Sequence, residues 1–487
     1  MLFTEPVFLF LFLPVLLGIV YATSGARHRE LANVVLLAAS LVFYAKGGGS
    51  FLWVMLASIA FNYAIAVVID ARRGTAAARR LVGVAVGVDL AVLAVFKYAR
   101  FVVENANALS AAAGAPPFAV PDVVLPIGIS FFTFHAISYV VDVYRRDAVA
   151  QKSPVHAALY LLLFPQLIAV PIIRYHEIAD QLAARDVTID GFAYGVRRFI
   201  AGLAKKMLIA NVVAVPVDAI FGMDPAALSA GHAWLGIVGY TLQIYFDFSG
   251  YSDMAIGLGA MFGFRFPENF DHPYVAESVQ EFWRRWHMSL SNWFRDYVYV
   301  PLGGNRVRPS RVYGNLVTVF FLCGLWHGAS WNFVVWGLFH GSFLVIERLG
   351  FRGVLRRMPS LFRHLYLLAV VMVGWVFFRA ATLGAALSYL RALAGLGAAA
   401  TTPFTVAWYS TPEFILAAAA GVVGSSRFGE RLWRRRLERA TVAHAERPAW
   451  APVAALTADA VVCAALLFLS MLRIAAGTYD PFIYFRF

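Results

Sequence analysis

The sequence Gly324-Leu-Trp-His-Gly328 lies inside an apolar run, residues 316–346, that is long enough to cross a lipid bilayer. An ionisable side chain such as that of His327 is costly in hydrocarbon, and such residues usually face a bundle interior or a wet cavity. The run therefore predicts a membrane protein whose functional site includes a buried histidine.

Apolar runs of this kind recur along the whole chain. Of its 487 residues, 61% are hydrophobic and 14% are charged, whereas soluble domains average about 25% charged residues. The composition indicates an all-α polytopic integral membrane protein, for which we expect about ten to thirteen membrane helices, some of them re-entrant. The runs are residues 7–22, 32–45, 51–70, 81–97, 123–143, 156–173, 232–262, 316–346, 364–379, 412–424 and 452–475.

The net charge of +13 does not indicate nucleic-acid binding, because the basic residues are scattered through short connections between apolar runs. In such connections they determine topology, since cytoplasmic loops are enriched in Lys and Arg. Basic residues follow the first, third and fifth runs, which predicts that the N-terminus lies outside the cytoplasm. Residues 427–439 then form a cytoplasmic connector, and the last helix carries the C-terminus outward. The basic residues are Arg27, Arg29, Arg72, Arg73, Arg79, Arg80, Arg145 and Arg146.

The motifs of several other protein classes are missing from the sequence. The two cysteines, Cys323 and Cys463, both lie in apolar runs, so they predict neither a disulfide framework nor a metal site. Nucleotide-binding glycine loops, the HExxH motif and the GxSxG motif are absent. Since no internal repeat is evident, we expect one membrane domain over residues 1–487, with its motifs concentrated in residues 120–350 and its longest outward connection among the first five runs in residues 98–122.

Two polar stretches interrupt the apolar pattern after residue 242. The first contains Asp247, Ser249 and Asp253, which either contact substrate or are paired with nearby arginines and fix helix packing. The second, residues 264–274, contains prolines and Asn269 and is predicted to be a loop that contacts a ligand or forms an ordinary turn.

Residues 281–296 predict a single amphipathic helix rich in tryptophan. At helical spacing Arg284, His287 and Ser291 share one face. One interpretation is a helix lying at the membrane interface, where Trp and Arg are favoured. The other is that Arg284, Arg285 or Arg295 binds an anionic acyl donor while His287 lines the pocket and orients either the donor or the acceptor.

Histidine suits proton transfer near neutral pH, because its ordinary pKa is about 6.5 and its ring has two nitrogens. His327 is therefore a candidate general base, the alternative being a residue that only packs. His340 can join it only if the chain breaks at residues 328–331. Cys323 lies one helical turn before His327, but a thiol in apolar surroundings is poorly ionised and is not expected to act as a nucleophile.

As an ordered set, seven stretches of the chain resemble the membrane-bound O-acyltransferase family, in particular its bacterial alginate O-acetyltransferase type, and more distantly the teichoic acid D-alanine transferase. The resemblance implies a ring of helices around a thin central region, with His327 as the catalytic histidine and His287 as the second motif histidine. Two positions depart from the family pattern, Val170 in place of a glycine and Cys323 in place of a glycine. The stretches are residues 8–14, 125–134, 138–145, 245–257, 282–287, 301–306 and 324–328.

Residues and resemblance together lead to a functional hypothesis. The protein is expected to move an acyl group, most simply acetyl, from a cytoplasmic thioester such as acetyl-CoA to a hydroxyl on the periplasmic side, for O-acetylation of an exopolysaccharide such as alginate. No bound cofactor or metal is expected. The resemblance implies a bacterial inner membrane with the N-terminus in the periplasm. It also implies periplasmic or membrane-anchored partner proteins that relay the acetyl group to the polymer. The alternatives are a proton-coupled transporter, in which Asp247, Asp253 and His327 form a relay, and a noncatalytic scaffold of a secretion complex.

Overall fold

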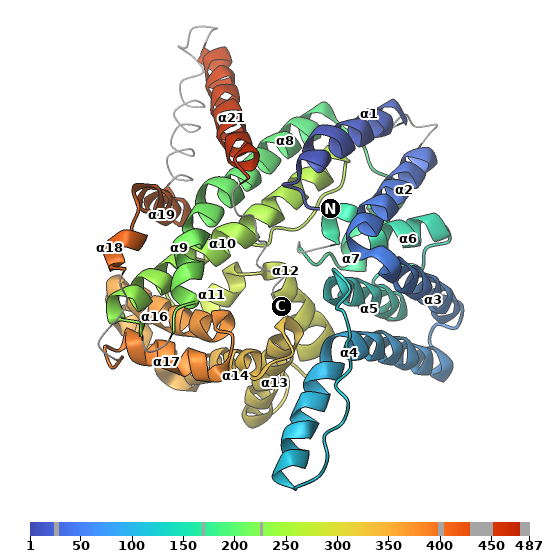
Figure 1. Cartoon of the computed structure of the whole chain (residues 1–487). Helices are drawn as coiled ribbons and strands as arrows, with labels where there is room; N and C mark the ends of the chain where they lie inside the picture. The colour runs from blue at the N-terminus through green and yellow to red at the C-terminus, as the bar shows by residue number, and fades with distance from the viewer. Residues whose placement is uncertain (24–28, 168–170, 225–226, 398–403, 429–450, 478–487) are drawn as a thin grey trace.

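The computed structural model of the chain describes residues 1–23, 29–167, 171–224, 227–397, 404–428 and 451–477 (Figure 1). In this part of the chain all regular structure is helical. The principal helices are α1 (Leu13–Thr23), α2 (Arg29–Gly48), α3 (Leu52–Ala71), α4 (Ala76–Ala112), α5 (Ile129–Arg145), α6 (Pro154–Leu162), α7 (Tyr175–Ala183), α8 (Ile189–Ala204), α9 (Asn211–Phe221), α10 (Ala230–Met261), α11 (Val279–Arg285), α12 (Met288–Phe294), α13 (Pro309–His327), α14 (Trp331–Ile346), α15 (Arg352–Arg357), α16 (Ser360–Arg379), α17 (Leu383–Leu393), α18 (Val406–Tyr409), α19 (Pro412–Ser425) and α21 (Ala451–Ala475).

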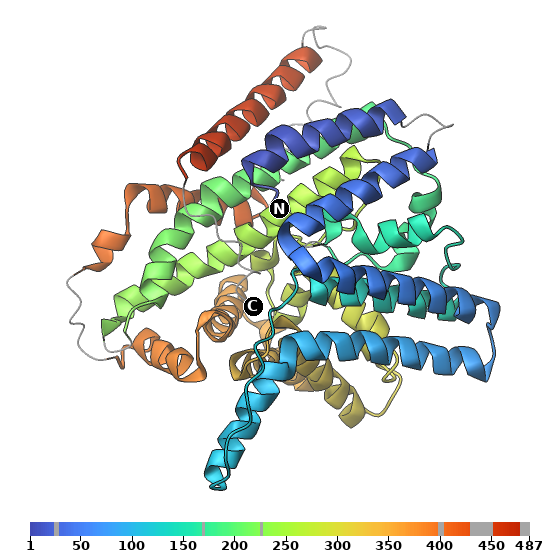
Figure 2. The ribbon, with the colours of Figure 1, turned by 45° about the vertical axis from the view of Figure 1, so that its right-hand side comes forward.

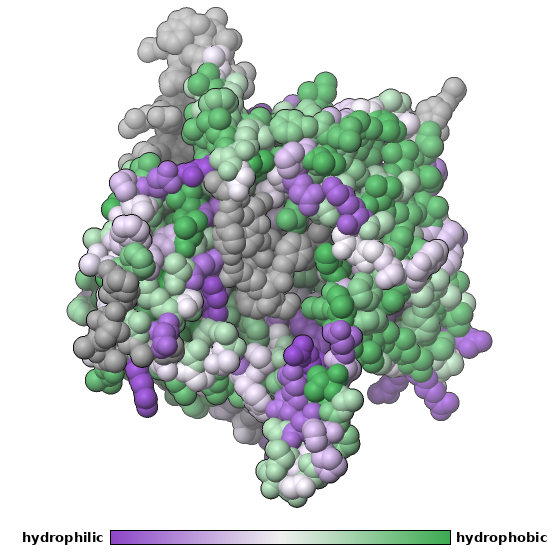
Figure 3. Space-filling view, in the orientation of Figure 1, coloured by the Kyte–Doolittle hydropathy of each residue, from purple (hydrophilic) through white to green (hydrophobic). Residues whose placement is uncertain are grey.

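The helices form a ring around a central region that holds α12 (Figure 1). Among the described residues, six helical segments are long and apolar enough to cross a membrane. Hydrophobic side chains cover large areas of the surface, as expected where lipid contacts the protein (Figure 3). The prediction of an all-helical polytopic membrane protein is confirmed. The six segments are Glu30–Ala71, Ala76–Ala112, Ile189–Phe221, Trp331–Arg357, Ser360–Arg379 and Thr457–Ala475.

The segment Ile189–Phe221 was absent from the apolar runs predicted by the sequence. It contains Lys205 and Lys206, which interrupt the apolar pattern and hide the span. In the structure both charges are neutralised by α10, because Lys205 pairs with Asp253 (2.6 Å) and Lys206 pairs with Asp247 (2.7 Å). The charges that concealed this helix therefore fasten it to its neighbour.

The backbones of α8 and α10 approach closely enough to require glycine. A Cβ atom added to Gly202 would lie 2.4 Å from the carbonyl oxygen of Gly250, which is closer than any real contact. Small residues at such crossings let helices meet backbone to backbone inside a membrane. The ion pair of Lys205 and Asp253 is placed beside this crossing, since Asp253 Cβ would lie 2.9 Å from the same added atom.

The structure corrects the predicted outward connection at residues 98–122. Helix α4 continues to Ala112, so that the non-helical connection begins only there. Its 37 residues rise about 55 Å, well beyond a hydrocarbon core of about 30 Å. The far end of α4 projects from the ring in both views (Figures 1 and 2). Asn107 fastens the returning chain through two hydrogen bonds with the backbone of Phe118 (2.6 and 2.9 Å).

The predicted run 316–346 is two helices rather than one. α13 ends at His327 and α14 begins at Trp331, with Gly328 in an extended conformation between them. The 264–274 stretch is the predicted loop, apart from a single helical turn at Pro273–Val275. Val170 lies outside the described residues, as does most of the predicted connector 427–439, of which Arg427 and Phe428 are described.

The buried ion pair between Lys206 and Asp247 should be essential as a pair. Their side chains are only 1% and 3% exposed, and removing one partner of a buried pair costs about 3–5 kcal/mol because the other charge is left uncompensated. Lys206→Met should therefore lower the midpoint of thermal unfolding in detergent, and Lys206→Met with Asp247→Leu should recover most of the loss. Lys46→Met, which removes an exposed pair with Glu5, is the control and should change the midpoint little. Equal effects of the Lys206 and Lys46 variants would show that the buried pair does not stabilise the helix contact.

Candidate active site

His327 is the last residue of α13 and is 6% exposed. Its ring is enclosed by those of Trp326, Trp336 and Phe378, at centroid separations of 4.9, 5.0 and 5.1 Å. The enclosure is made possible by the break after His327, which turns α14 back along α13. The helix end therefore places an imidazole inside an aromatic pocket.

The crossing of α13 and α14 next to His327 is again a contact between glycines. A Cβ atom on Gly324 would lie 2.3 Å from the carbonyl oxygen of Phe333, and one on Gly337 would lie 2.2 Å from that of Phe320. Neither position could hold a larger residue without separating the helices. Gly324 of the quoted motif thus serves the packing that positions His327.

The same break brings His340 close to His327. His340 is fully buried and contacts Trp336 (5.2 Å between ring centroids) and Trp283 (5.1 Å). Because Trp336 also contacts His327, one indole lies against both histidines. The break at residues 328–331 was the condition under which the sequence analysis expected His340 to join His327, and the structure contains this break.

The predicted single helix over residues 281–296 is wrong. α11 ends at Arg285, and His287 adopts a left-handed conformation (φ 44°, ψ 56°) before α12 begins. Left-handed backbone is uncommon for residues other than glycine and cannot continue a helix. Arg284, His287 and Ser291 consequently do not share one helical face. The break turns the 1% exposed ring of His287 toward Trp326, at a centroid separation of 6.2 Å.

Lys97 and Tyr98 on α4 hold the end of α13 and were missed by the sequence analysis. The ammonium of Lys97 donates hydrogen bonds to the carbonyls of Trp326 and His327, the latter at 3.3 Å. The hydroxyl of Tyr98 donates to the carbonyl of Leu325 (2.7 Å). The last carbonyls of a helix lack partners within the helix, and a cation there also interacts favourably with the helix dipole. The sequence feature that could have identified this contact is the lysine at the end of the apolar run 81–97.

The two carboxylates predicted near residue 250 lie in ion pairs. Asp247 pairs with Lys206, and Asp253 accepts from Arg198 (2.7 Å) as well as from Lys205. This arrangement matches the structural alternative, in which the carboxylates fix helix packing, although the partners are chiefly lysines. Ser249 is 1% exposed, and its hydroxyl has no hydrogen-bond partner among the described residues.

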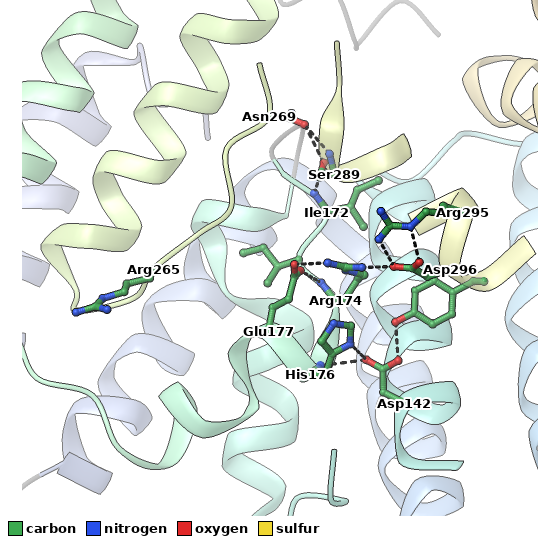
Figure 4. Close-up of polar contacts among 12 residues, drawn as sticks. Asp142, Ile172, Arg174, His176, Glu177, Arg265, Asn269, Ser289, Arg295 and Asp296 are labelled. Carbon is green, nitrogen blue, oxygen red and sulfur yellow. Dashed lines mark hydrogen bonds and ion pairs between the residues drawn. The ribbon is translucent and has the colours of Figure 1, made fainter. Parts of the chain in front are cut away.

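Two of the three predicted anion-binding arginines are engaged with carboxylates. Arg285 pairs with Glu281 (2.9 Å) and Asp271 (2.7 Å). Arg295 pairs with Asp296 (2.7 Å), which also binds Arg174 (Figure 4). Both arginines therefore have structural partners.

A neighbouring network fastens the start of α7 to α5. Asp142, which is buried, accepts hydrogen bonds from Tyr297 (2.6 Å) and from Nδ1 of His176 (2.9 Å) (Figure 4). The hydrogen bond with Asp142 raises the pKa of His176 above its ordinary value. The network ties together α5, α7 and the helical turn after α12.

Arg284 lines a pocket of about 540 Å³ that also contains Cys323. Arg348 and Arg352 line it too, and all three arginines are exposed. Arg348 donates to the side-chain oxygen of Asn305 (2.7 Å), a neutral acceptor that leaves the arginine charge in place. Since Cys323 is one helical turn before His327, the pocket extends from basic residues toward the candidate base.

Residues 96–384 match MBOAT, the membrane-bound O-acyltransferase family. The match covers more than half of the chain, and the chain therefore belongs to this family and is a multi-pass membrane O-acyltransferase. It is 42% identical to the "Probable alginate O-acetylase AlgI" of Azotobacter vinelandii and 40% identical to that of Pseudomonas aeruginosa, in each case over 100% of both chains. It is also 37% identical to the "Peptidoglycan O-acetyltransferase" of Helicobacter pylori, over 81% of this chain and 80% of the relative.

These relatives confirm the family resemblance drawn from the sequence. Their names describe O-acetyltransferases, which favours the enzyme over the transporter and scaffold alternatives. The aromatic pocket around His327 is then a candidate active site for acyl transfer.

Removing the Lys97 ammonium should impair activity without unfolding the protein. Lys97→Met leaves the carbonyls of Trp326 and His327 without these hydrogen bonds, and misplacing a catalytic group by about 1 Å can cost about a hundredfold in rate. We expect kcat for acyl transfer to fall at least tenfold, with a smaller loss in Tyr98→Phe, because that variant removes a single bond. Lys97→Arg should retain more activity than Lys97→Met. Arg100→Ala, on the exposed continuation of α4, is the control. Full activity of Lys97→Met would show that this contact does not position His327.

Proposed function

We propose that the chain transfers an acetyl group from a cytoplasmic thioester, acetyl-CoA being the simplest, to a hydroxyl on the periplasmic side, for O-acetylation of an exopolysaccharide such as alginate. The observation that carries the proposal is the arrangement at the end of α13, where His327 and His287 both contact Trp326. The substrate follows the names of the full-length relatives.

In the proposed step His327 acts as general base. It takes the proton of the acceptor hydroxyl while the oxygen attacks the carbonyl carbon of the thioester. The carbon–sulfur bond then breaks, and His327 returns the proton to the leaving thiolate. The products are an O-acyl ester and a free thiol, and no acyl-enzyme is formed. Cys323 takes no part as a nucleophile.

The basic pocket fits the acyl donor. Coenzyme A carries phosphates, and guanidinium groups bind phosphate through charge-assisted hydrogen bonds. Arg284, Arg348 and Arg352 line the pocket together with Phe320 and Cys323. Glu347, also in the lining, accepts hydrogen bonds from the backbone N–H groups of Val279 and Gln280. An acyl donor lying along this pocket would direct its thioester toward His327.

The acceptor is proposed to come from a partner protein. The end of α4, with the chain returning from it, projects from the ring (Figure 2) and is too small to bind a long polysaccharide. We therefore propose a periplasmic or membrane-anchored partner that accepts the acetyl group and relays it to the polymer. The Trp331 indole donates to Asn105 on α4 (2.9 Å), so such a partner, bound at the end of α4, would stand near His327.

Acetyl transfer from labelled acetyl-CoA by the chain in proteoliposomes is the central test. Oligosaccharides of the polymer are added together with a periplasmic extract of the producing cell, and the wild type should acetylate these oligosaccharides. Without the extract it should leave them unmodified. His327→Ala and His327→Gln should each remove most activity while the protein remains inserted, because loss of one imidazole leaves the apolar burial unchanged. Normal turnover by either variant would refute His327 as the base. Efficient polymer acetylation without the extract would refute the relay.

The pocket arginines should govern affinity for the acyl donor. Arg284→Ala combined with Arg348→Ala should raise KM for acetyl-CoA about fivefold to tenfold at low salt with little change in kcat, because each arginine contributes about 1 kcal/mol or less to binding at an exposed site. The effect should shrink at high ionic strength. Arg100→Ala is the control for the loss of an exposed arginine. An unchanged KM for acetyl-CoA in the double variant would show that the acyl donor binds in another pocket.

The proposed orientation places Arg79 in the cytoplasm and the end of α4 in the periplasm. Both Arg79 and Leu109 are exposed. In a background without Cys463, a cysteine at position 109 should react with a membrane-impermeant thiol reagent added to spheroplasts, and a cysteine at position 79 should react only after the membrane is opened. The reverse pattern would invert the orientation.

A further inference from the structure

A chain of hydrogen bonds leads from the backbone before α7 to His287. Figure 4 shows its first three members, Ile172, Ser289 and Asn269. The backbone N–H of Ile172 donates to the hydroxyl of Ser289 (2.9 Å). That hydroxyl donates in turn to Oδ1 of Asn269 (2.9 Å). Asn269 and Ser289 are 1% and 3% exposed, so water does not compete for these bonds.

The side-chain amide of Asn269 has one possible orientation. The backbone N–H of Ser289, which can only donate, points to Oδ1 of Asn269 (3.3 Å). The other end of the amide, Nδ2, donates to the hydroxyl of Ser252 (3.1 Å). Exchanging the oxygen and nitrogen would set the NH₂ group against the N–H of Ser289 and lose a buried hydrogen bond. The oxygen therefore faces His287.

The orientation of Asn269 fixes the proton on the His287 ring. Nδ1 of His287 lies 3.2 Å from Oδ1 of Asn269, and an amide oxygen only accepts. The hydroxyl of Ser289 also lies near Nδ1, but at 3.5 Å, and its single hydrogen goes to the nearer Oδ1 of Asn269 (2.9 Å). Nδ1 therefore carries the hydrogen. In a neutral imidazole the other nitrogen, Nε2, then holds a lone pair and can only accept. Nε2 of His287 has no hydrogen-bond partner among the described residues.

We infer that Asn269 and Ser289 hold His287 as the Nδ1–H tautomer, so that Nε2 accepts a hydrogen bond from the hydroxyl of the acyl acceptor. This inference rests on the proposed function. A thioester carbonyl oxygen also only accepts, so a ring with an unprotonated Nε2 cannot stabilise it. The sequence analysis left open whether His287 orients the acyl donor or the acyl acceptor. The Nδ1–H tautomer favours the acyl acceptor.

His287 thus accepts the hydrogen bond of the hydroxyl while the acceptor binds. When the oxygen attacks the thioester, the hydroxyl turns its single proton from Nε2 of His287 to His327, which takes it. Asn269 and Ser289 touch neither substrate in this arrangement and are positioning residues. The backbone of Asn269 supports the same role, since its carbonyl accepts from the N–H of Met288 (2.9 Å) and fixes the loop to α12.

The tautomer can be measured directly and without any activity. Solid-state NMR of the full chain in proteoliposomes, labelled with ¹⁵N-histidine, gives the His287 signals as the difference between the wild type and His287→Gln. A protonated Nδ1 and an unprotonated Nε2 are expected. In Asn269→Leu the preference should be lost. A protonated Nε2 in the wild type would overturn the inference while leaving the proposed function untouched.

Two-substrate kinetics test what the tautomer does. Asn269→Leu should raise KM for the acceptor about tenfold or more, as expected for losing an oriented hydrogen bond to a substrate, with KM for acetyl-CoA unchanged. Asn269→Asp, which keeps an oxygen facing Nδ1, should lose less than Asn269→Leu. His287→Asn can still donate to Asn269 but has no atom at the place of Nε2, and should be as impaired as His287→Ala.

Asn315→Leu is the matched control, because Asn315 is also a buried asparagine (6% exposed) and its amide donates to the carbonyl of Leu302 (3.2 Å). It should leave KM for the acceptor as in the wild type. If Asn269→Leu instead raised KM for acetyl-CoA, His287 would serve the acyl donor and the inference would be wrong. A wild type that transfers no acetyl group would refute the proposed function itself, whatever tautomer the NMR spectrum reports.

Discussion

Hydrocarbon offers no hydrogen bonds, so every polar group inside a membrane protein must find its partner within the protein. A helix that ends in mid-membrane exposes carbonyls that cannot be satisfied by water. In this chain α13 ends in the protein interior, at the buried His327, and the carbonyls of its last turn are met by Lys97 and Tyr98 from α4. The break before α14 leaves the last carbonyls of α13 without partners in the helix. The long helix α4 supplies the hydrogen-bond donors that these carbonyls need.

The centre of the protein repeats this arrangement at His287. A left-handed residue breaks a helix, and the polar groups set free are bound by a loop that returns from α10. Each candidate catalytic histidine therefore lies at a helix end rather than in the middle of a helix. Helix ends let the backbone turn a side chain toward a neighbouring ring, and Trp326 is contacted by both histidines for this reason.

Apolar runs and motif order were sufficient to predict the helical membrane fold, the family and the importance of Gly324-Leu-Trp-His-Gly328. The break at His287 could not be predicted, because residues 281–296 fit helical periodicity equally well with or without it. The role of Lys97 could not be predicted either, because the carbonyls that it binds lie about 230 residues later in the chain. The span Ile189–Phe221 was hidden by lysines whose neutralising partners belong to another helix. In each case the deciding contact joins residues distant in sequence.

The pairing of Lys206 with Asp247 has a consequence for how the chain enters the membrane during synthesis. The lysine emerges from the ribosome some forty residues before the aspartate that neutralises it, as the spacing of the two positions shows. Until α10 follows, the segment containing α8 and α9 carries uncompensated positive charge and is poorly retained in lipid. The two segments are therefore expected to enter the lipid together, as a paired hairpin. Membrane insertion of α8, α9 and α10 is thus expected to be cooperative, with the synthesis of Asp247 as its commitment point.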